Sequence, residues 1–128
     1  MILKFRAWHK TWEELGKVKR IRFDGEGNVT TVLFEGKILG VDTHTDEIEL
    51  MQSTGLKDKN GKEIFEGDIV DYKGRKAVAK WHGSYASFVY RFVDELNKRS
   101  AEWYPLFLAY YHFEVIGNIY ENKELLDA

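Results

Sequence analysis

The sequence contains no cysteine and only one proline among its 128 residues. The lack of cysteine excludes disulfide bonds and thiolate metal sites, and it fits a reducing compartment. No apolar run approaches the roughly 20 residues that an α-helix needs to span a bilayer. Charged residues also follow Met1 too closely for the apolar core of a signal peptide. We therefore expect a cytoplasmic protein with no membrane partner.

Neither sign of charge dominates, because the formal net charge is -2. Such a balance gives no overall attraction to nucleic acid or to an acidic membrane surface, so any binding of that kind requires a local patch. The length is that of one domain, and a chain of this size can bury about two-thirds of its extended-chain surface. We expect a single domain over residues 1–128, with a subdivision near Gln52 as the alternative.

Short segments rich in β-branched and aromatic residues alternate with turns that contain glycine. Strands spaced about every 8–12 residues with such turns are typical of an all-β barrel or sandwich. Helical character is confined to residues 93–103, which Pro105 should end, and to a short C-terminal segment at 121–128. The expected strands are residues 2–8, 17–23, 29–34, 38–41, 48–52, 69–72, 76–81, 85–92 and part of 106–116.

The stretch TGLKDKNGKEIFEGDIV, residues 54–70, has the strongest local signals in the chain. Asn60 and Gly61 tolerate a positive φ at little steric cost and therefore indicate a tight turn. The Asp58 side chain can hydrogen-bond to the backbone two residues later and tighten the same turn. Replacement of Asp58 by Asn should then change little, because Asn can make the same contact.

A second turn follows at Glu66, Gly67 and Asp68. On an extended strand the two carboxylates would share one face, where a buried acid could act in proton transfer. The alternative, which we favour, is structural: Asp68 accepts hydrogen bonds from backbone amides of the turn and Glu66 faces water. The sequence also lacks a nucleophile elbow and a phosphate-binding glycine loop. We expect no enzymatic activity, no catalytic residues and no cofactor.

Residues 54–70 resemble the signature of the YopX family of phage and prophage proteins. Two flanking pieces agree with it in the same order, KFRAW at residues 4–8 and FEVIGNIYEN at residues 113–122. The resemblance implies a small, mainly β protein that forms an irregular pseudo-barrel with some SH3-like character and one or two short helices. It implies the cytoplasm of a host cell, and it implies no reaction and no catalytic residues.

An acidic run near the middle of the chain is the strongest metal candidate. Carboxylates with one imidazole suit a divalent cation, and on a strand Asp42, His44 and Asp46 would share one face. The alternative is a solvated loop with scattered acids, since a lone histidine without a second ligand at a suitable spacing is weak evidence. We favour the solvated loop and expect no metal.

Basic and aromatic residues gather in two places. Small barrels bind single-stranded nucleic acid by stacking bases on exposed aromatic rings beside cations. The alternative is that the aromatic residues, which make up 15% of the chain, fill the core. The candidate residues for nucleic-acid binding are Lys17, Lys19, Arg20 and Arg22 in the first place, and Arg75, Lys76, Lys80, Trp81, Tyr85 and Arg91 in the second.

Three hypotheses about function remain. The first is a non-enzymatic accessory protein of a phage or prophage, an interaction or structural module. Its partner would be a protein or a second copy of the chain, bound through an edge strand or an aromatic patch. The second is a nucleic-acid-binding protein, and the third is a metal-dependent hydrolase that uses Asp42, His44 and Asp46.

Overall fold

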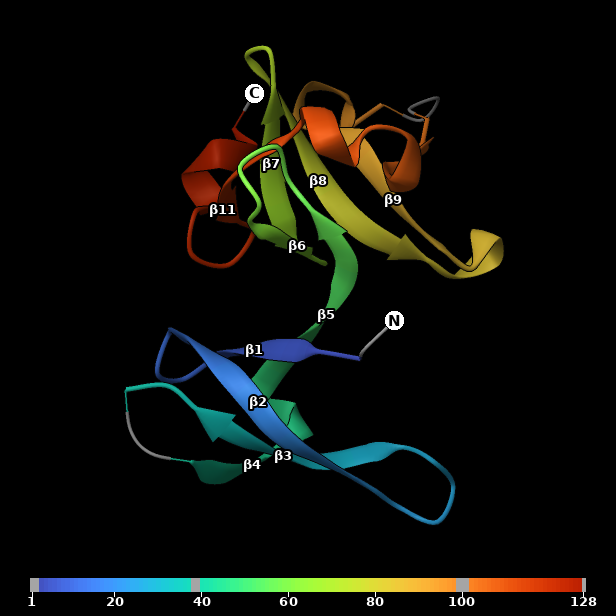
Figure 1. The fold of residues 1–128 in the computed structure, drawn as a ribbon. Coiled ribbons are helices and arrows are strands. Elements are labelled where there is room, and N and C mark those ends of the chain that lie inside the picture. The colour runs from blue at the N-terminus through green and yellow to red at the C-terminus, as the bar shows by residue number, and fades with distance from the viewer. Residues whose placement is uncertain (1–2, 38–39, 99–101, 128) are drawn as a thin grey trace. The chain divides into compact units, whose positions relative to one another are not determined.

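The computed structural model describes residues 3–37, 40–98 and 102–127. Antiparallel strands dominate the described residues, which confirms the prediction of a mainly β protein (Figure 1). The chain divides into two compact units, one that ends at Gln52 and one that begins at Ser53. The strand order describes open sheets and no closed barrel within the described residues. The SH3-like character and the single YopX-like domain stay predictions.

The N-terminal unit is a meander of antiparallel strands in the order β4-β3-β2-β1-β5. Buried Ala7, Val32, Phe34 and Ile48 form its core. The strands are β1 (Phe5–His9), β2 (Glu14–Phe23), β3 (Val29–Glu35), β4 (Val41–His44) and the first half of β5 (Ile48–Lys57). The 3-10 helix η1 (Thr45–Glu47) joins β4 to β5.

A β-bulge in β2 places the apolar residues of this strand on one face and its basic residues on the other. Val18 lies opposite Phe34 and Ile21 lies opposite Val32, although Val18 and Ile21 are an odd number of residues apart. The register shifts between Val18 and Arg20, so one extra residue is inserted there. Both apolar side chains therefore face the core, while the basic side chains of β2 are turned to the other face.

The C-terminal unit is built on a second antiparallel sheet with the order β10-β9-β8-β7-β11. Its strands are β7 (Asp68–Tyr72), β8 (Arg75–His82), β9 (Ser87–Phe92), β10 (Tyr104–Pro105) and β11 (Glu114–Asn118). The second half of β5 pairs with the short strand β6 (Glu63–Phe65). The 3-10 helix η2 (Gly83–Tyr85) forms the tip of the β8–β9 hairpin.

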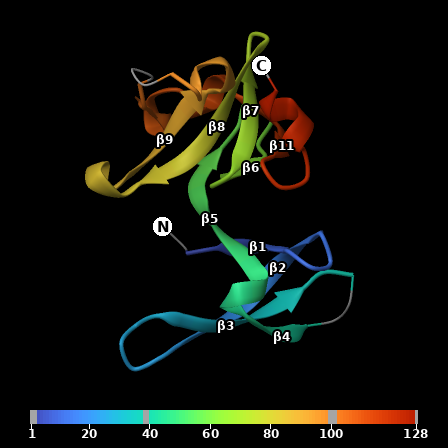
Figure 2. The same cartoon turned by 180° about the vertical axis from the view of Figure 1, so that it is seen from behind.

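One face of this sheet is covered by the segment between β10 and β11. Two 3-10 helices lie there, η4 (Leu106–Leu108) and η5 (Tyr110–His112). Figure 1 shows them in front of β8, and Figure 2 shows the same sheet from behind. Leu106 and Phe113 are buried with Ile64 and Val70 in the core between this segment and the sheet.

The helices expected from the sequence differ from those observed. Residues 93–103 contain only the 3-10 helix η3 (Val93–Glu95), and residues 99–101 of that prediction lie outside the described residues. The C-terminal segment forms a 3-10 helix as well, η6 (Lys123–Leu126). The expectation that part of 106–116 is strand is confirmed from Glu114 onward, where β11 begins, whereas the residues before it form η4 and η5. Leu106, Ala109, Tyr110 and Phe113 face the core at helical spacing, a signal that the apolar composition of the segment obscured.

None of the helices in the described residues is long and apolar enough to cross a membrane.

Candidate functional site

The Asp58 carboxylate lies at the centre of the 54–70 stretch, and backbone amides surround it. Its Oδ1 accepts the N–H groups of Asn60 at 2.9 Å and Lys62 at 2.8 Å. Its Oδ2 accepts the N–H of Val115, on β11, at 2.8 Å. A further bond runs from the Lys59 N–H to the carbonyl of Phe113. The turn therefore closes the outer edge of β11.

These hydrogen bonds also set the proton affinity of the Asp58 carboxyl. Burial raises the pKa of Asp58, but the hydrogen bonds from Val115, Lys62 and Asn60 and the charge of Lys62 lower it by more. The pKa of Asp58 therefore lies below its ordinary value, and the group is a carboxylate at neutral pH. A carboxylate held by several donors suits a structural role better than proton transfer.

The second turn of the stretch is tied to its surroundings in the same way. Asp68 is buried, and its Oδ2 accepts the Phe65 N–H at 2.7 Å. The Gly67 N–H donates to the Ala79 carbonyl, and the Gly67 carbonyl accepts the Ile119 N–H. Gly67 has a φ of 86° and Gly61 a φ of 82°, in the left-handed region that favours glycine.

In the C-terminal motif, residues 113–122, asparagine side chains also accept hydrogen bonds from backbone N–H groups. The Asn118 Oδ1 accepts the N–H groups of Tyr120 and Glu121, and its Nδ2 donates to Glu121 Oε1. The Asn122 Oδ1 accepts the Asn118 N–H at 3.1 Å. A Cβ on Gly117 would lie only 2.4 Å from that oxygen, so this close approach requires glycine. The central motif and the C-terminal motif are thus joined to each other by backbone contacts.

The metal candidates lie in the N-terminal unit and do not form a ligand set. Asp42 lies on β4, where its Oδ1 is 3.2 Å from the guanidinium of Arg20. Asp46 lies beyond the strand in η1, and its N–H donates to His44 Nδ1. In residues 3–37, 40–98 and 102–127, no three His, Asp or Glu side chains are placed to hold a metal ion.

The basic residues of β2 face solvent beside acidic residues of the neighbouring strands. Lys19 Nζ is 3.9 Å from Glu35, and Arg20 is paired with Asp42. Lys17 and Arg22 are exposed on the same strand. Since Lys19 and Arg20 form ion pairs and Lys17 lies opposite Glu35, this cluster is a weaker anion-binding candidate than its sequence indicates.

The β8–β9 hairpin has two faces, and the candidate residues divide between them. Ala77 and Ala79 are buried on the core face, opposite Phe92 and Tyr90. By strand alternation Arg75 and Trp81 share that core face, whereas Lys76, Lys80 and His82 share the other, which we call the outer face. Arg91 of β9 lies opposite Val78 and is therefore also on the outer face.

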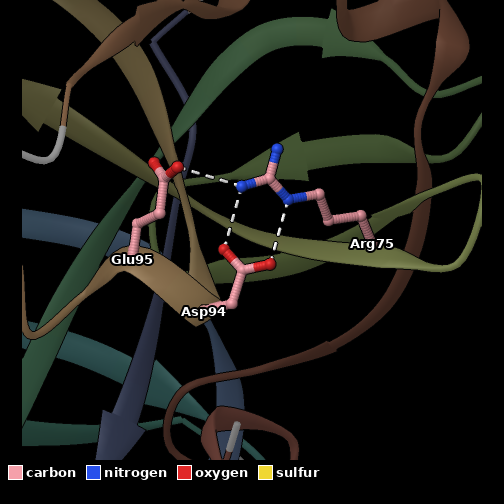
Figure 3. Close-up of polar contacts among 3 residues, drawn as sticks. All are labelled: Arg75, Asp94 and Glu95. Carbon is pink, nitrogen blue, oxygen red and sulfur yellow. Dashed lines mark hydrogen bonds and ion pairs between the residues drawn. The ribbon is translucent and has the colours of Figure 1, made fainter.

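Arg75 does not join the other cations of the hairpin. Its Nε and one terminal nitrogen donate to the two oxygens of Asp94 at 3.0 and 2.9 Å, and the same terminal nitrogen also donates to Glu95 (Figure 3). The guanidinium lies 3.6 Å from the centre of the Phe92 ring. The hydrogen bond to Asp94 raises the pKa of Arg75 and lowers that of Asp94. Arg75 thus fastens the start of β8 to η3.

The outer face carries a cluster around Trp103. Two cations approach its ring, Lys80 Nζ at 5.1 Å and the Arg91 guanidinium at 4.7 Å from the ring centre. His82 contacts the same ring edge-on and stacks on Tyr85 with the ring centres 4.2 Å apart. The Tyr85 side chain is 66% exposed. The outer-face cluster therefore combines cations with a ring that is open to solvent.

The other aromatic candidates face the core or its margin. Tyr90 packs edge-on against Phe113, and burial raises the pKa of its hydroxyl, with Tyr104 and Tyr72 adding to the shift. Trp81 contacts Phe88 edge-on and is 42% exposed. The sequence interpretation that aromatic residues fill the core therefore holds for Tyr90, whereas Trp81 and Tyr85 reach the surface.

An exposed apolar surface lies on η4 and η5, and the sequence reasoning did not single it out. Its members Phe107, Leu108 and Tyr111 are 58%, 62% and 55% exposed. Their neighbours Leu106 and Tyr110 pack into the core and hold the segment in place. We call these three residues the 106–112 surface. Trp103 was also missed, because no pattern in the sequence places it beside Lys80 and Arg91.

Together these observations describe a small β protein in which Asp58, Asp68 and Asn118 accept backbone N–H groups and in which Tyr85, Phe107 and Tyr111 of the C-terminal unit are exposed. The model of the family described as YopX protein matches residues 4–127, and the chain belongs to the YopX family.

Among solved structures, the chain is similar to that of protein EF1440 from Enterococcus faecalis. The two are 30% identical with a TM-score of 0.69, over 99% of each chain. A search of curated proteins gave no match.

Proposed function

We propose that this YopX family member is a non-enzymatic accessory protein of a phage or prophage, which acts in the host cytoplasm as a protein-binding module. Its binding surface is the 106–112 surface. The observation that carries this proposal is the outward placement of Phe107, Leu108 and Tyr111 on a segment that the core holds in place. Contiguous exposed apolar groups are characteristic of binding sites, because their burial against a partner is favourable.

The sheet edges of the C-terminal unit favour an aromatic patch over strand pairing as the mode of contact. The outer edge of β11 is taken by the Asp58 carboxylate and by the Lys59 N–H. The opposite edge strand, β10, has two residues and ends in Pro105, which has no N–H to donate. An added strand would find few free backbone groups on either side.

The absence of enzymatic activity is part of the proposal and is supported by the contacts of the motif acids. Asp58 and Asp68 both accept backbone N–H groups, so their oxygens are occupied where a substrate would need them. General acid or base groups in enzymes are shifted toward neutral pKa values, whereas the pKa of Asp58 is lowered. The arrangement supports a scaffold role for these residues.

The test is capture of partners by the immobilised full chain from a lysate of the producing cells. The variant Phe107→Ser/Leu108→Ser/Tyr111→Ser removes the 106–112 surface, and Phe23→Ser, at an exposed apolar site on β2, is the matched control. We expect a protein that the wild type and Phe23→Ser retain and the triple variant loses. That protein, once purified, should bind directly in calorimetry with a negative heat-capacity change.

Circular dichroism should show that the triple variant keeps the wild-type fold. If the folded triple variant retains the same proteins as the wild type, the proposal is wrong. It is also wrong if the wild type captures no partner and sediments as a monomer at every concentration, because a second copy of the chain is then excluded as well.

A further inference from the structure

We propose that the outer face of the β8–β9 hairpin binds single-stranded nucleic acid. In this arrangement Lys80 and Arg91 contact phosphate groups and Tyr85 stacks on a base. The inference goes beyond the protein-binding proposal, because it concerns a different surface made by different residues.

The ring of Tyr85 is largely exposed to solvent and is not packed into the core. His82 covers one face of it, with the ring centres 4.2 Å apart and the planes 17° apart. The exposed remainder of the Tyr85 ring is therefore available to a planar group from solvent. Tyr85 belongs to the 3-10 helix η2, and Ala86 follows it with a φ of 47°, which reverses the chain into β9. A base stacked there would extend the existing pair of rings, and such stacking does not depend on base identity.

Cationic side chains lie near Tyr85 on the outer face of the β8–β9 hairpin. Lys76, Lys80, His82 and Arg91 all belong to the outer face, and the Lys80 and Arg91 side chains both approach the Trp103 ring. Arg91 is also oriented by a hydrogen bond from its terminal nitrogen to the carbonyl of Lys98. Cations held against an indole ring keep their charge at a fixed position, and phosphates spaced along a backbone can bind them.

The acidic groups near the outer face lie beside Lys76 and beyond the ends of the hairpin, and not beside Lys80 and Arg91. Asp71 lies opposite Lys76 in the sheet, and its Oδ2 accepts the Gly74 N–H. Asp94 and Glu95 are engaged by Arg75, beyond the other end of the hairpin. In the described ranges no ion pair involves Lys80 or Arg91, whereas Glu102 is exposed beside Trp103. Positive charge is therefore concentrated at Lys80 and Arg91, on a chain whose net charge is -2.

Single strands fit this face better than a duplex does. An exposed ring can stack only on a base that is free of its neighbours or its complement. Reading of a duplex commonly uses an α-helix in the major groove, and the described residues contain only 3-10 helices. The shared ligand chemistry is an unpaired base followed by phosphates, which DNA and RNA both provide.

The experiment is fluorescence anisotropy with the full chain and labelled oligonucleotides of about 20 nucleotides, a length above the site size of a small barrel. Three probes are used: oligo-dT, oligo-U and a mixed-sequence DNA duplex. We expect the single strands to bind more tightly than the duplex, with affinity that falls between about 50 and 200 mM salt. The difference between oligo-dT and oligo-U then shows which nucleic acid is preferred.

Variants separate the two kinds of contact. Lys80→Ala should reduce the slope of log affinity against log salt by about 0.7, the value for one phosphate contact on a single strand. Tyr85→Ser should lower affinity by about 5-fold or more at an unchanged slope, because stacking is not ionic. Arg75→Ala removes the same charge from a residue already paired with Asp94 and Glu95, and it is the matched control with an unchanged slope.

The inference is overturned if the wild type binds neither single strand at about 50 mM salt, where phosphate contacts are strongest. It is also overturned if Lys80→Ala and Arg75→Ala change the slope equally, or if the duplex binds as tightly as the single strands. The triple variant of the 106–112 surface should keep its nucleic-acid affinity. If neither the wild type nor the variants bind oligonucleotides, this inference is wrong but the protein-binding proposal is not affected. The two proposals are therefore tested independently.

Discussion

The Oδ2 atom of Asp58 accepts the backbone N–H of Val115 at 2.8 Å, although the two residues are 57 positions apart in the chain. The other oxygen of the same carboxylate closes the local turn through Asn60 and Lys62. One side chain thus joins the central motif to the C-terminal motif. Both oxygens act as acceptors, and this fact determines what a substitution at Asp58 should do.

Asp58→Asn should destabilise the protein by about 1–3 kcal/mol, the range for a buried group left without its partner. An Asn side chain has one oxygen for the turn amides, so its NH₂ group would face the Val115 N–H. The local turn alone suggested that Asn would serve equally well, and the contact with Val115 reverses that expectation. Denaturant unfolding of wild type and variant measures the difference.

Asp24→Asn is the control for this experiment. Asp24 makes a similar turn, with Oδ1 accepting the N–H groups of Glu26 and Asn28, but it is exposed in the β2–β3 loop. Its Oδ2 accepts a hydrogen bond from the side-chain amide of Asn28. Little change is expected there, and equal losses at Asp24 and Asp58 would contradict the importance of the Val115 contact.

The lowered pKa of Asp58 predicts a loss of stability in acid. The folded state holds the Asp58 proton less tightly than the unfolded state, whose Asp pKa is about 3.9. The unfolded state therefore binds more protons as pH falls, so the stabilisation is complete above about pH 4 and is lost as pH falls through the lower folded-state pKa. Unfolding free energies measured from pH 6 downward check this.

In that series, the stability difference between wild type and Asp58→Asn isolates the contribution of this carboxyl. The difference should be constant near neutral pH and should shrink in acid. A difference that stays constant below pH 4 would mean that the pKa of Asp58 is the same in both states.

Gly61→Val should cost about 1–3 kcal/mol, because Gly61 has a φ of 82° and β-branched residues rarely adopt that conformation. No atom lies within 4 Å of the Cβ position, so the expected loss comes from the backbone and not from a clash. Gly61→Asn should cost less, since Asn tolerates the left-handed region.

Gly25→Val provides the comparison for Gly61, since Gly25 also has open space at its Cβ position and lies outside the left-handed region. Chemical denaturation of Gly25→Val, Gly61→Asn and Gly61→Val should show that Gly61→Val is the least stable of the three, as the backbone conformation of Gly61 predicts. A Gly61→Val protein as stable as Gly25→Val would show that the turn can change its conformation freely.

Gly16→Ala should destabilise the N-terminal unit by about 1–3 kcal/mol through overpacking. A Cβ at Gly16 would lie 2.5 Å from Phe34 Cζ and 2.8 Å from the Glu35 carbonyl oxygen. The Phe34 ring is buried and has little freedom to move. Gly83→Ala, where no atom lies within 4 Å of the Cβ position, serves as the control in the same thermal unfolding experiment.

The parts of the fold that sequence reasoning predicted are those set by local chemistry. The β2–β3 hairpin forms around Asp24 and Asn28, as its turn residues indicate, and its second strand begins at Val29. Gly61 and Gly67 have the positive φ values on which the turn assignment depended. In each case a few neighbouring residues determine the conformation.

The parts that were not predicted depend on residues distant in the chain. The pairing of Arg75 with Asp94 removes it from the group of free cations, although the two are 19 positions apart. Trp103 reaches Lys80 and Arg91 only because β10 pairs with β9 beside it. The helical spacing of Leu106, Ala109, Tyr110 and Phe113 was readable, but the apolar composition of 106–116 led only to the expectation that part of it is strand.

The contact between Asp58 and Val115 has a consequence for synthesis on the ribosome. The Asp58 carboxylate leaves the exit tunnel long before Val115 has been translated, so it must remain hydrated while the nascent chain grows. The C-terminal sheet can close its β11 edge only after residues 114–118 have been translated. Until then a stalled or truncated chain would expose backbone groups of β7 that β11 normally pairs, and these would be open to aggregation.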